Sequence, residues 1–282
     1  MFKIKKYIPD IVVAIILIAG IGLLAYPTIG DYINALHSSK AIGSYVEKTK
    51  DLSKEEKENL LREAREYNES LVGKVNRYYL NEEEKKRYAH ILDITKTGIM
   101  AYVEIPKLNI YMPVYHGTDE GLLQIAAGHL PGSSLPVGGE NTHSLISGHR
   151  GLPSAKLFTD IDKLKKGDLF FIHVFDEVLA YKVNQIKIVL PDDVETLEIE
   201  KGKDYVTLIT CTPYGVNSHR LLVRGERTVY KQSESKIEDM IKKNNLKYIM
   251  LTAGVILALI GMTVLVSVFL IKRRKRRKLN EK

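Results

Sequence analysis

The chain has 282 residues, of which 45% are hydrophobic, and its formal net charge is +8. This charge lies at the two ends, because residues 1–10 carry +2 and residues 272–282 carry +7, which leaves −1 for the remainder. A nearly neutral central region has no electrostatic reason to bind nucleic acid, so we expect no nucleic-acid partner. The length allows one domain with a core of its own plus accessory segments.

A first apolar run, residues 11–26, contains no charged residue and follows three lysines near the N-terminus. This pattern is typical of a signal peptide or of a slightly short membrane span. No small-residue cleavage site follows cleanly, so we favour an uncleaved anchor within residues 1–30. A cleaved signal peptide stays the alternative.

A second apolar run, residues 248–271, is uncharged and long enough to cross a membrane. Seven consecutive basic residues follow it, and such a block stays in the cytoplasm by the positive-inside rule. We therefore predict a two-pass plasma-membrane protein with both termini cytoplasmic and residues 31–247 outside. Residues 231–247 would form a stalk and residues 272–282 a basic cytoplasmic tail.

The region 31–97 is predicted to be a helical arm outside the membrane. Ser53 and Glu56 form a capping box for a helix from about residue 51 to about residue 80. Asn81, with Glu84 three residues later, marks the start of a second helix.

From residue 98 to residue 230 short β-rich runs alternate with Gly, Pro, Asn and Asp. Eight short strands in one such region favour an all-β fold with a closed barrel, because closure removes exposed strand edges. The expected strands lie near residues 99–104, 109–115, 122–127, 143–147, 169–175, 179–189, 205–211 and 221–229.

Cys211 is the only cysteine, so in an exported chain it is either a buried inert thiol or a reactive one. It ends a β-branched run, and turn residues follow it directly, which predicts a side chain at a strand end. A nucleophilic thiolate here needs a nearby imidazolium or guanidinium, since no helix begins at this point.

Arg220 stands at the start of the returning strand, where it could stabilise an oxyanion or simply cap the turn. Four histidines in turn-rich contexts stay open as the acid and base: His116, His129, His149 and His219. Among them His149, at the exit of a strand, is the best placed on local grounds.

These residues lie in stretches that together carry a resemblance. The stretch from Thr210 to Gly225, TCTPYGVNSHRLLVRG, resembles the signature of sortases, specifically the pilin-polymerising class C. The motifs EIPK (104–107), YHGT (115–118), GHLPG (128–132) and SGHRGLP (147–153) match the same family in the same order.

The resemblance implies an eight-stranded sortase barrel with Cys211 as nucleophile, His149 as acid and base, and Arg220 as the substrate-orienting cation. It also implies cleavage of the Thr-Gly bond of a Leu-Pro-X-Thr-Gly-like sorting signal on surface proteins or pilin subunits. An amine, usually a pilin lysine, then resolves the thioester. A thioester keeps the acyl group activated, so no cofactor is expected, and no metal-ligand cluster is visible in the sequence.

Class C sortases typically carry a lid with an Asp-Pro-aromatic motif, and this chain has no Asp-Pro. Residues 72–97 occupy the corresponding stretch, with Tyr78 and Tyr79 as possible aromatic substitutes. The nearest rival function is a sortase that anchors proteins to a peptidoglycan amine. A papain-like protease is disfavoured, because it would place its cysteine before its histidine and at a helix start. An L,D-transpeptidase motif is likewise missing, and a non-enzymatic receptor would bury the thiol.

Overall fold

The computed structural model describes residues 8–230 and residues 250, 253, 254 and 261. The predicted second span, residues 248–271, lies outside the described residues apart from those four positions. The predicted stalk and basic tail lie outside them as well. Residues 33–230 belong to one compact unit, which holds the strands and the helices α2 and α3.

The first helix, α1 (Ile8–Asp51), is continuous and contains Pro27. Among the described residues it provides the one stretch, Ile15–Asp51, that is long and apolar enough to cross a membrane. A signal sequence would meet the same criterion, so the helix supports a single candidate span near the N-terminus. The boundary expected after residue 30 does not interrupt the helix.

The two capping boxes predicted from the sequence are both formed. Ser53 caps α2 (Lys54–Leu71) and Asn81 caps α3 (Glu82–His90), and in each case the glutamate three residues on returns a hydrogen bond. α2 is shorter than the helix expected over residues 51–80, because it ends at Leu71 and Gly73 then adopts a left-handed backbone with φ +72°. The segment between α2 and α3, residues 72–81, therefore belongs to neither helix.

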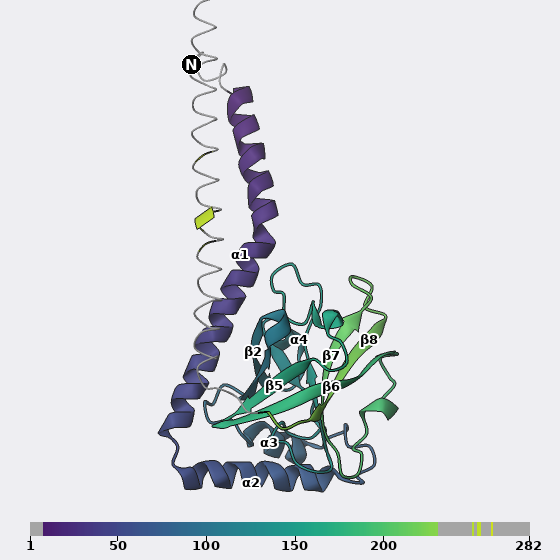
Figure 1. Cartoon of the computed structure of the whole chain (residues 1–282). Helices are drawn as coiled ribbons and strands as arrows, with labels where there is room; N and C mark the ends of the chain where they lie inside the picture. The colour runs from purple at the N-terminus through teal and green to yellow at the C-terminus, as the bar shows by residue number, and fades with distance from the viewer. Residues whose placement is uncertain (1–7, 231–249, 251–252, 255–260, 262–282) are drawn as a thin grey trace, which may run out of the picture. The chain divides into compact units, whose positions relative to one another are not determined.

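Eight strands close into a barrel, as predicted, in the order β1-β2-β3-β4-β7-β8-β6-β5 (Figure 1). The β2–β3 and β4–β7 pairs are parallel and the other pairs are antiparallel. The strands are β1 (Ile99–Ile105), β2 (Ile110–His116), β3 (Ala127–His129), β4 (Thr142–Ser147), β5 (Leu169–Val174), β6 (Glu177–Val189), β7 (Asp204–Thr212) and β8 (His219–Arg227). Short helical turns are η2 (Pro106–Leu108), α4 (Glu120–Leu123), η3 (Ile161–Lys163) and η4 (Glu195–Leu197).

The strand expected at residues 122–127 is wrong. Residues 120–123 form the helical turn α4, and the strand β3 begins only at Ala127. A short apolar run does not distinguish a strand from a helical turn. Gly128 lies within β3, and a Cβ there would lie 2.2 Å from the carbonyl oxygen of Gly117. Only glycine lets β3 approach the end of β2 so closely.

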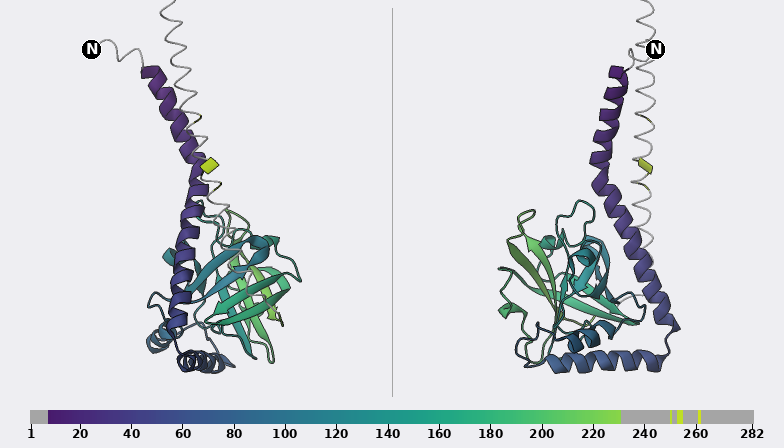
Figure 2. Two further views of the ribbon diagram at one scale, coloured as in Figure 1. Left: turned by 60° about the vertical axis from the view of Figure 1, so that its left-hand side comes forward. Right: turned by 180° about the vertical axis from the view of Figure 1, so that it is seen from behind.

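The arm packs on the barrel through two tyrosines. On α1, Tyr45 donates its hydroxyl to the carbonyl of Met100 (3.1 Å) and accepts the N–H of Phe175 (3.0 Å). On α3, the hydroxyl of Tyr88 lies 2.9 Å from Nδ1 of the buried His129. Figure 2 shows α2 lying across one end of the barrel, with α3 between α2 and the strands.

Candidate active site

Cys211 lies one residue before the end of β7 and is partly exposed. Side chains alternate across a strand, so Thr207, Ile209 and Cys211 face the same side of the sheet. β7 is hydrogen-bonded on both sides, to β4 in parallel and to β8 in antiparallel orientation. The thiol therefore sits at the end of an internal strand that is held on both edges.

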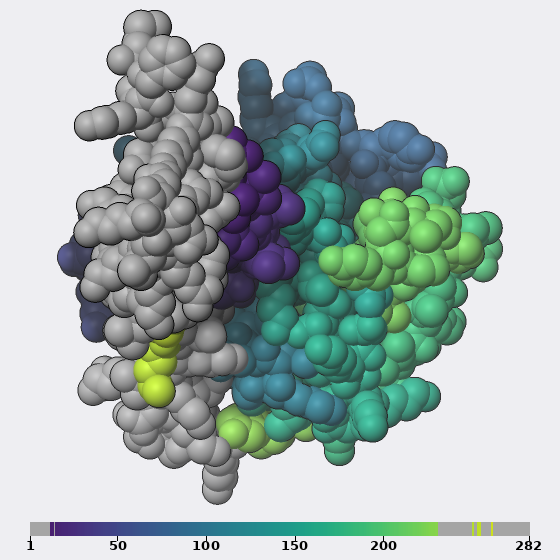
Figure 3. Space-filling view, turned by 90° about the horizontal axis from the view of Figure 1, so that it is seen from above, coloured from purple at the N-terminus to yellow at the C-terminus, as the bar shows by residue number. Residues whose placement is uncertain are grey.

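Arg220 is the direct cross-strand partner of Cys211 in the β7–β8 pair. Its guanidinium donates hydrogen bonds to the carbonyls of Asn217 and His219, each at 3.2 Å. No carboxylate among the described residues forms an ion pair with it, so its charge remains available to a bound group. The connection between these strands projects at the surface, where its light-green residues stand out in the space-filling view (Figure 3).

The segment around His149 is joined to the end of β7 on both sides of the histidine. Before it, Gly148 donates its N–H to the carbonyl of Ile209 (3.0 Å) and accepts the hydroxyl of Thr210 (2.7 Å). After it, Arg150 donates to the hydroxyl of Thr212 at 3.3 Å. The residues that flank His149 thus contact the residues that flank Cys211.

Gly148 is required for this approach. A Cβ at position 148 would lie 2.6 Å from the ring of Phe158, which is completely buried. Phe158 also donates its N–H to the carbonyl of His149 at 3.1 Å. The ring of Phe158 therefore supports the backbone that presents His149 to β7.

An apolar cluster continues along the sheet from the cysteine, and we call it the apolar face. Tyr78 and Leu130 pack against it, whereas the side chain of Tyr79 is 84% exposed. Of the two aromatic residues that the sequence suggested for a lid, only Tyr78 occupies this surface. The buried members of the apolar face are Leu145, Val189, Leu197, Ile209 and Leu222.

Comparison with known proteins finds the same fold in other chains. The sortase domain family model matches residues 103–228. Sortase C1 from Streptococcus agalactiae is 48% identical in sequence, with a TM-score of 0.66 over 68% of this chain and 100% of that one. Streptococcus pneumoniae sortase C is 47% identical, with a TM-score of 0.62 over 69% of this chain and 99% of that one.

The chain belongs to the sortase family. Among curated relatives, sortase A of Bacillus anthracis is 32% identical over 133 residues, which cover 47% of this chain and 61% of that protein. Sortase D of Bacillus subtilis is 31% identical over 44% of this chain and 62% of its own length. The matched region thus spans about three-fifths of these relatives.

Two of the four histidines that the sequence left open as acid and base, His116 and His129, are instead held by contacts within the fold. His129 is completely buried, and burial lowers its pKa to about 3, so the ring is neutral. His116 has both ring nitrogens against backbone carbonyls, those of Gly98 and Ile91. Neither histidine is free to exchange protons with a substrate, which leaves His149 and His219. The residues that flank His149 contact β7 on both sides of Cys211, and His219 is the cross-strand partner of Thr212.

Sequence reasoning missed Arg150, although the residue stands inside the SGHRGLP motif. Its guanidinium is almost buried and pairs with Asp162 on η3 while it donates to Thr212. Asp162 is twelve residues away and carries no local signal. An arginine next to the candidate acid and base was the one available clue. Arg150 is a positioning residue, because it ties the His149 segment to the residue that follows Cys211.

Arg150→Met should lower kcat by about tenfold or more, because small misplacements of reacting groups cost that much. KM for a sorting peptide should change far less, and Arg150→Lys should restore only part of kcat, since a lysine cannot bridge two partners with a planar fork. Steady-state kinetics would measure both. Lys156→Met, a basic residue of the same loop, is the matched control. Equal kcat in Arg150→Met and Lys156→Met would remove Arg150 from the site.

Proposed function

We propose that this protein is a cysteine transpeptidase that cleaves a Leu-Pro-X-Thr-Gly-like sorting signal and joins the acyl part to an amine. The observation that carries the proposal is the arrangement at the end of β7. Cys211 lies directly across from the uncompensated Arg220, and the segment of His149 is hydrogen-bonded on both sides of the cysteine. This arrangement supplies a nucleophile, a cation for developing negative charge and an acid and base.

In the first half-reaction the thiolate of Cys211 attacks the carbonyl carbon of the Thr-Gly bond. The carbonyl electron pair moves onto oxygen, and the guanidinium of Arg220 stabilises that oxyanion. When the intermediate collapses, the C–N bond breaks and His149 gives a proton to the departing glycine amine. The products are a thioester on Cys211 and the released C-terminal fragment.

In the second half-reaction an amine attacks the thioester carbonyl and His149, now neutral, accepts a proton from it. The C–S bond breaks and the thiolate of Cys211 is restored, so no nucleotide cofactor is consumed. A lysine ε-amine of a pilin subunit is the acceptor that the similarity to C-type sortases favours. The solved structure of Streptococcus pneumoniae sortase C is described as giving insight into pilin substrate specificity. A peptidoglycan amine, as in cell-wall anchoring, is the second acceptor to compare.

Cys211→Ala should fold normally and form no acyl-enzyme, because the change removes the only thiol and little packing at a strand end. The test incubates the parent and the variant with a sorting peptide and each acceptor, a lysine-bearing pilin subunit or a peptidoglycan amine. Mass spectrometry identifies the covalent products, and the acceptor that is joined decides between the two transpeptidase functions. A thioester adduct on Cys211→Ala would end the assignment of the nucleophile.

We also propose that Tyr78 occupies the apolar face until a substrate peptide displaces it. The ring packs on the cluster beside Cys211, while the thiol itself stays partly exposed, so access should be reduced rather than abolished. Among the described residues, no carboxylate forms an ion pair with Arg220. The hydroxyl of Tyr78 is instead bonded by Arg77 at 2.8 Å.

Tyr78→Ala should react with a thiol-directed probe that carries a sorting peptide about five- to thirtyfold faster than the parent, since one aromatic contact contributes about 1–2 kcal/mol. Iodoacetamide, which needs no apolar face, should label both proteins at similar rates. Tyr79→Ala is the matched control, because its exposed ring contacts nothing that the probe must displace. If Tyr78→Ala and Tyr79→Ala react with the peptide probe at the same rate, Tyr78 is not the occupant.

We propose further that the protein crosses the plasma membrane twice, with residues 31–247 outside. The apolar helix α1 and the uncharged run 248–271 with its basic flank support this topology. Protease added to intact protoplasts should digest the external domain and spare tags at both termini. Loss of a C-terminal tag under these conditions would refute the two-pass arrangement.

A further inference from the structure

The connection between β6 and β7, residues 190–203, supplies one side of the apolar face, and we call it the wall loop. Leu197 at the end of η4 is the wall-loop residue that is buried in the apolar face. Leu190 and Val194 on the same loop are exposed by 61% and 43%. The position of Leu197 relative to Ile209 on β7 therefore depends on what holds the loop in place.

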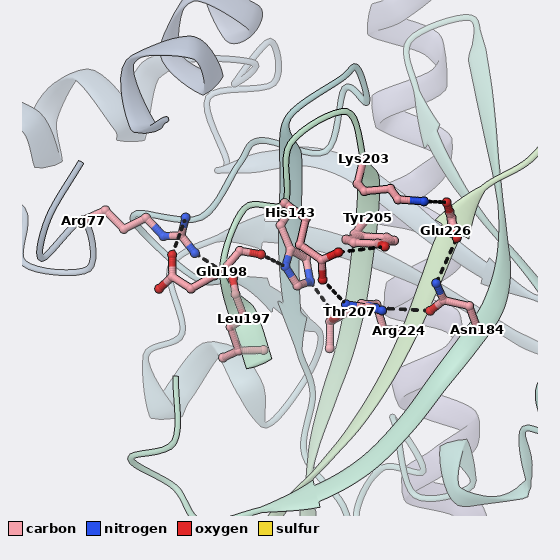
Figure 4. Close-up of polar contacts among 11 residues, drawn as sticks. Arg77, His143, Asn184, Leu197, Glu198, Lys203, Tyr205, Thr207, Arg224 and Glu226 are labelled. Atoms are coloured by element: carbon pink, nitrogen blue, oxygen red, sulfur yellow. Dashed lines mark hydrogen bonds and ion pairs between the residues drawn. The ribbon is translucent and has the colours of Figure 1, made fainter. Parts of the chain in front are cut away.

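Arg77, from the segment between α2 and α3, holds the carbonyl of Leu197. Its guanidinium donates to that oxygen at 2.6 Å and lies 3.6 Å from the carboxylate of Glu198 (Figure 4). The Arg77 side chain is only 4% exposed. A charged donor in such an environment makes strong hydrogen bonds, because little water competes for the acceptor.

His143 on β4 holds the next carbonyl along the loop. Its Nδ1 lies 2.9 Å from the oxygen of Glu198, and its Nε2 lies 2.7 Å from the hydroxyl of Thr207 on β7. Burial lowers the pKa of His143 to about 4, so the ring is neutral. A carbonyl only accepts hydrogen bonds, so Nδ1 carries the proton and Nε2 accepts from the threonine. Figure 4 shows the ring between the wall loop and the strand.

The backbone of Arg77 is fixed by the barrel and does not depend on Tyr78. Gly132 packs so closely that a Cβ there would lie 2.1 Å from the carbonyl oxygen of Arg77. Downstream, Tyr88 is anchored to His129 and accepts the N–H of Gly117 at 3.0 Å. The GHLPG motif thus contacts the segment that precedes the barrel, residues 72–98, on both sides of Tyr78. We call these residues the pre-barrel segment. When Tyr78 leaves the apolar face, Arg77 loses the hydroxyl at 2.8 Å and the ring at 4.9 Å but keeps its own contacts with Leu197 and Glu198.

We propose that Arg77 and His143 are positioning residues that hold the wall loop against β7, so that the pre-barrel segment completes the binding surface for the substrate. This inference rests on the proposed function. The group that binds to the apolar face is an apolar side chain of an extended substrate peptide. Such a peptide, with its acyl carbon at Cys211, would lie along β7. At about 3.4 Å per residue, Ile209 is about 7 Å and Thr207 about 14 Å from Cys211, a length that holds a four-residue signal.

Adjacent residues of one segment then have opposite effects on substrate binding. Removing the ring of Tyr78 frees the apolar face, whereas removing the charge of Arg77 loosens the wall. If the segment only covered the apolar face, substitutions at Arg77 and at Tyr78 would both strengthen substrate binding. Opposite effects on KM at the two positions therefore indicate that Arg77 supports the binding surface while Tyr78 blocks it.

The test uses the full chain in detergent with a fluorescent sorting peptide. Arg77→Met should raise KM by about tenfold or more, because a charge-assisted hydrogen bond to the loop is lost, while kcat and the iodoacetamide labelling rate of Cys211 change by less than about twofold. Arg77→Lys should recover part of the effect. His143→Phe, which keeps an aromatic ring but no hydrogen bond to Glu198, should raise KM in the same direction. Tyr79→Ala is the control.

Hydrogen exchange of the wall loop gives a readout that does not need turnover. Amides within residues 190–203 should exchange faster in Arg77→Met and in His143→Phe than in the parent, with the β7 and β8 amides unchanged. Parent-like exchange and an unchanged KM in folded Arg77→Met would overturn the inference. If the parent protein itself does not process sorting peptides, the proposed function fails, and the exchange result still decides whether these residues hold the loop.

Discussion

The candidate site depends on the pairing of β7 with its two neighbours. The antiparallel register with β8 places Arg220 directly opposite Cys211, and the parallel pairing with β4 brings the chain out of Ser147 into Gly148 and His149 beside the same strand end. A one-residue slip in either pair would turn these side chains to opposite faces of the sheet. Because β7 is paired on both edges, a shift of β7 would have to change both pairings at once. Barrel closure thus fixes the geometry that a lone strand end could not hold.

The sequence predicted those parts of the structure that depend on residues close together in the chain. The capping boxes at Ser53 and Asn81 and the β-branched run before Cys211 are formed by residues within a few positions of one another. Contacts across long separations carry no such signal. Arg77 meets Leu197 across 120 residues, and nothing in the sequence near position 77 indicates a buried cation. The resemblance to sortases supplied the choice of His149, which local patterns alone left open.

The segment between α2 and α3 would combine the two proposed roles, to cover the apolar face and to support the wall loop. The backbone at Arg77 packs against Gly132, and its guanidinium bonds the wall loop, although its Nε has no partner. An unsatisfied buried donor costs free energy, so the contacts at the other nitrogens must outweigh that cost. The side chain of Tyr78 packs on the apolar face, its hydroxyl contacts Arg77 and Leu197, and its ring centroid lies 4.9 Å from the Arg77 guanidinium. Rotation of one side chain can therefore clear the apolar face while the adjacent support stays in place.

The histidines of the barrel show how burial assigns such roles. His129 and His143 use both ring nitrogens in contacts with the surrounding fold, and burial keeps each ring neutral. A neutral imidazole with one donor and one acceptor orients two neighbours at once, which suits the docking of α3 and of the wall loop. The same burial denies these rings the exchange of protons that acid and base chemistry needs. His149 stands on a glycine-flanked turn and is partly exposed. That exposure is what the proposed acid and base at Cys211 requires, and His219 is partly exposed as well.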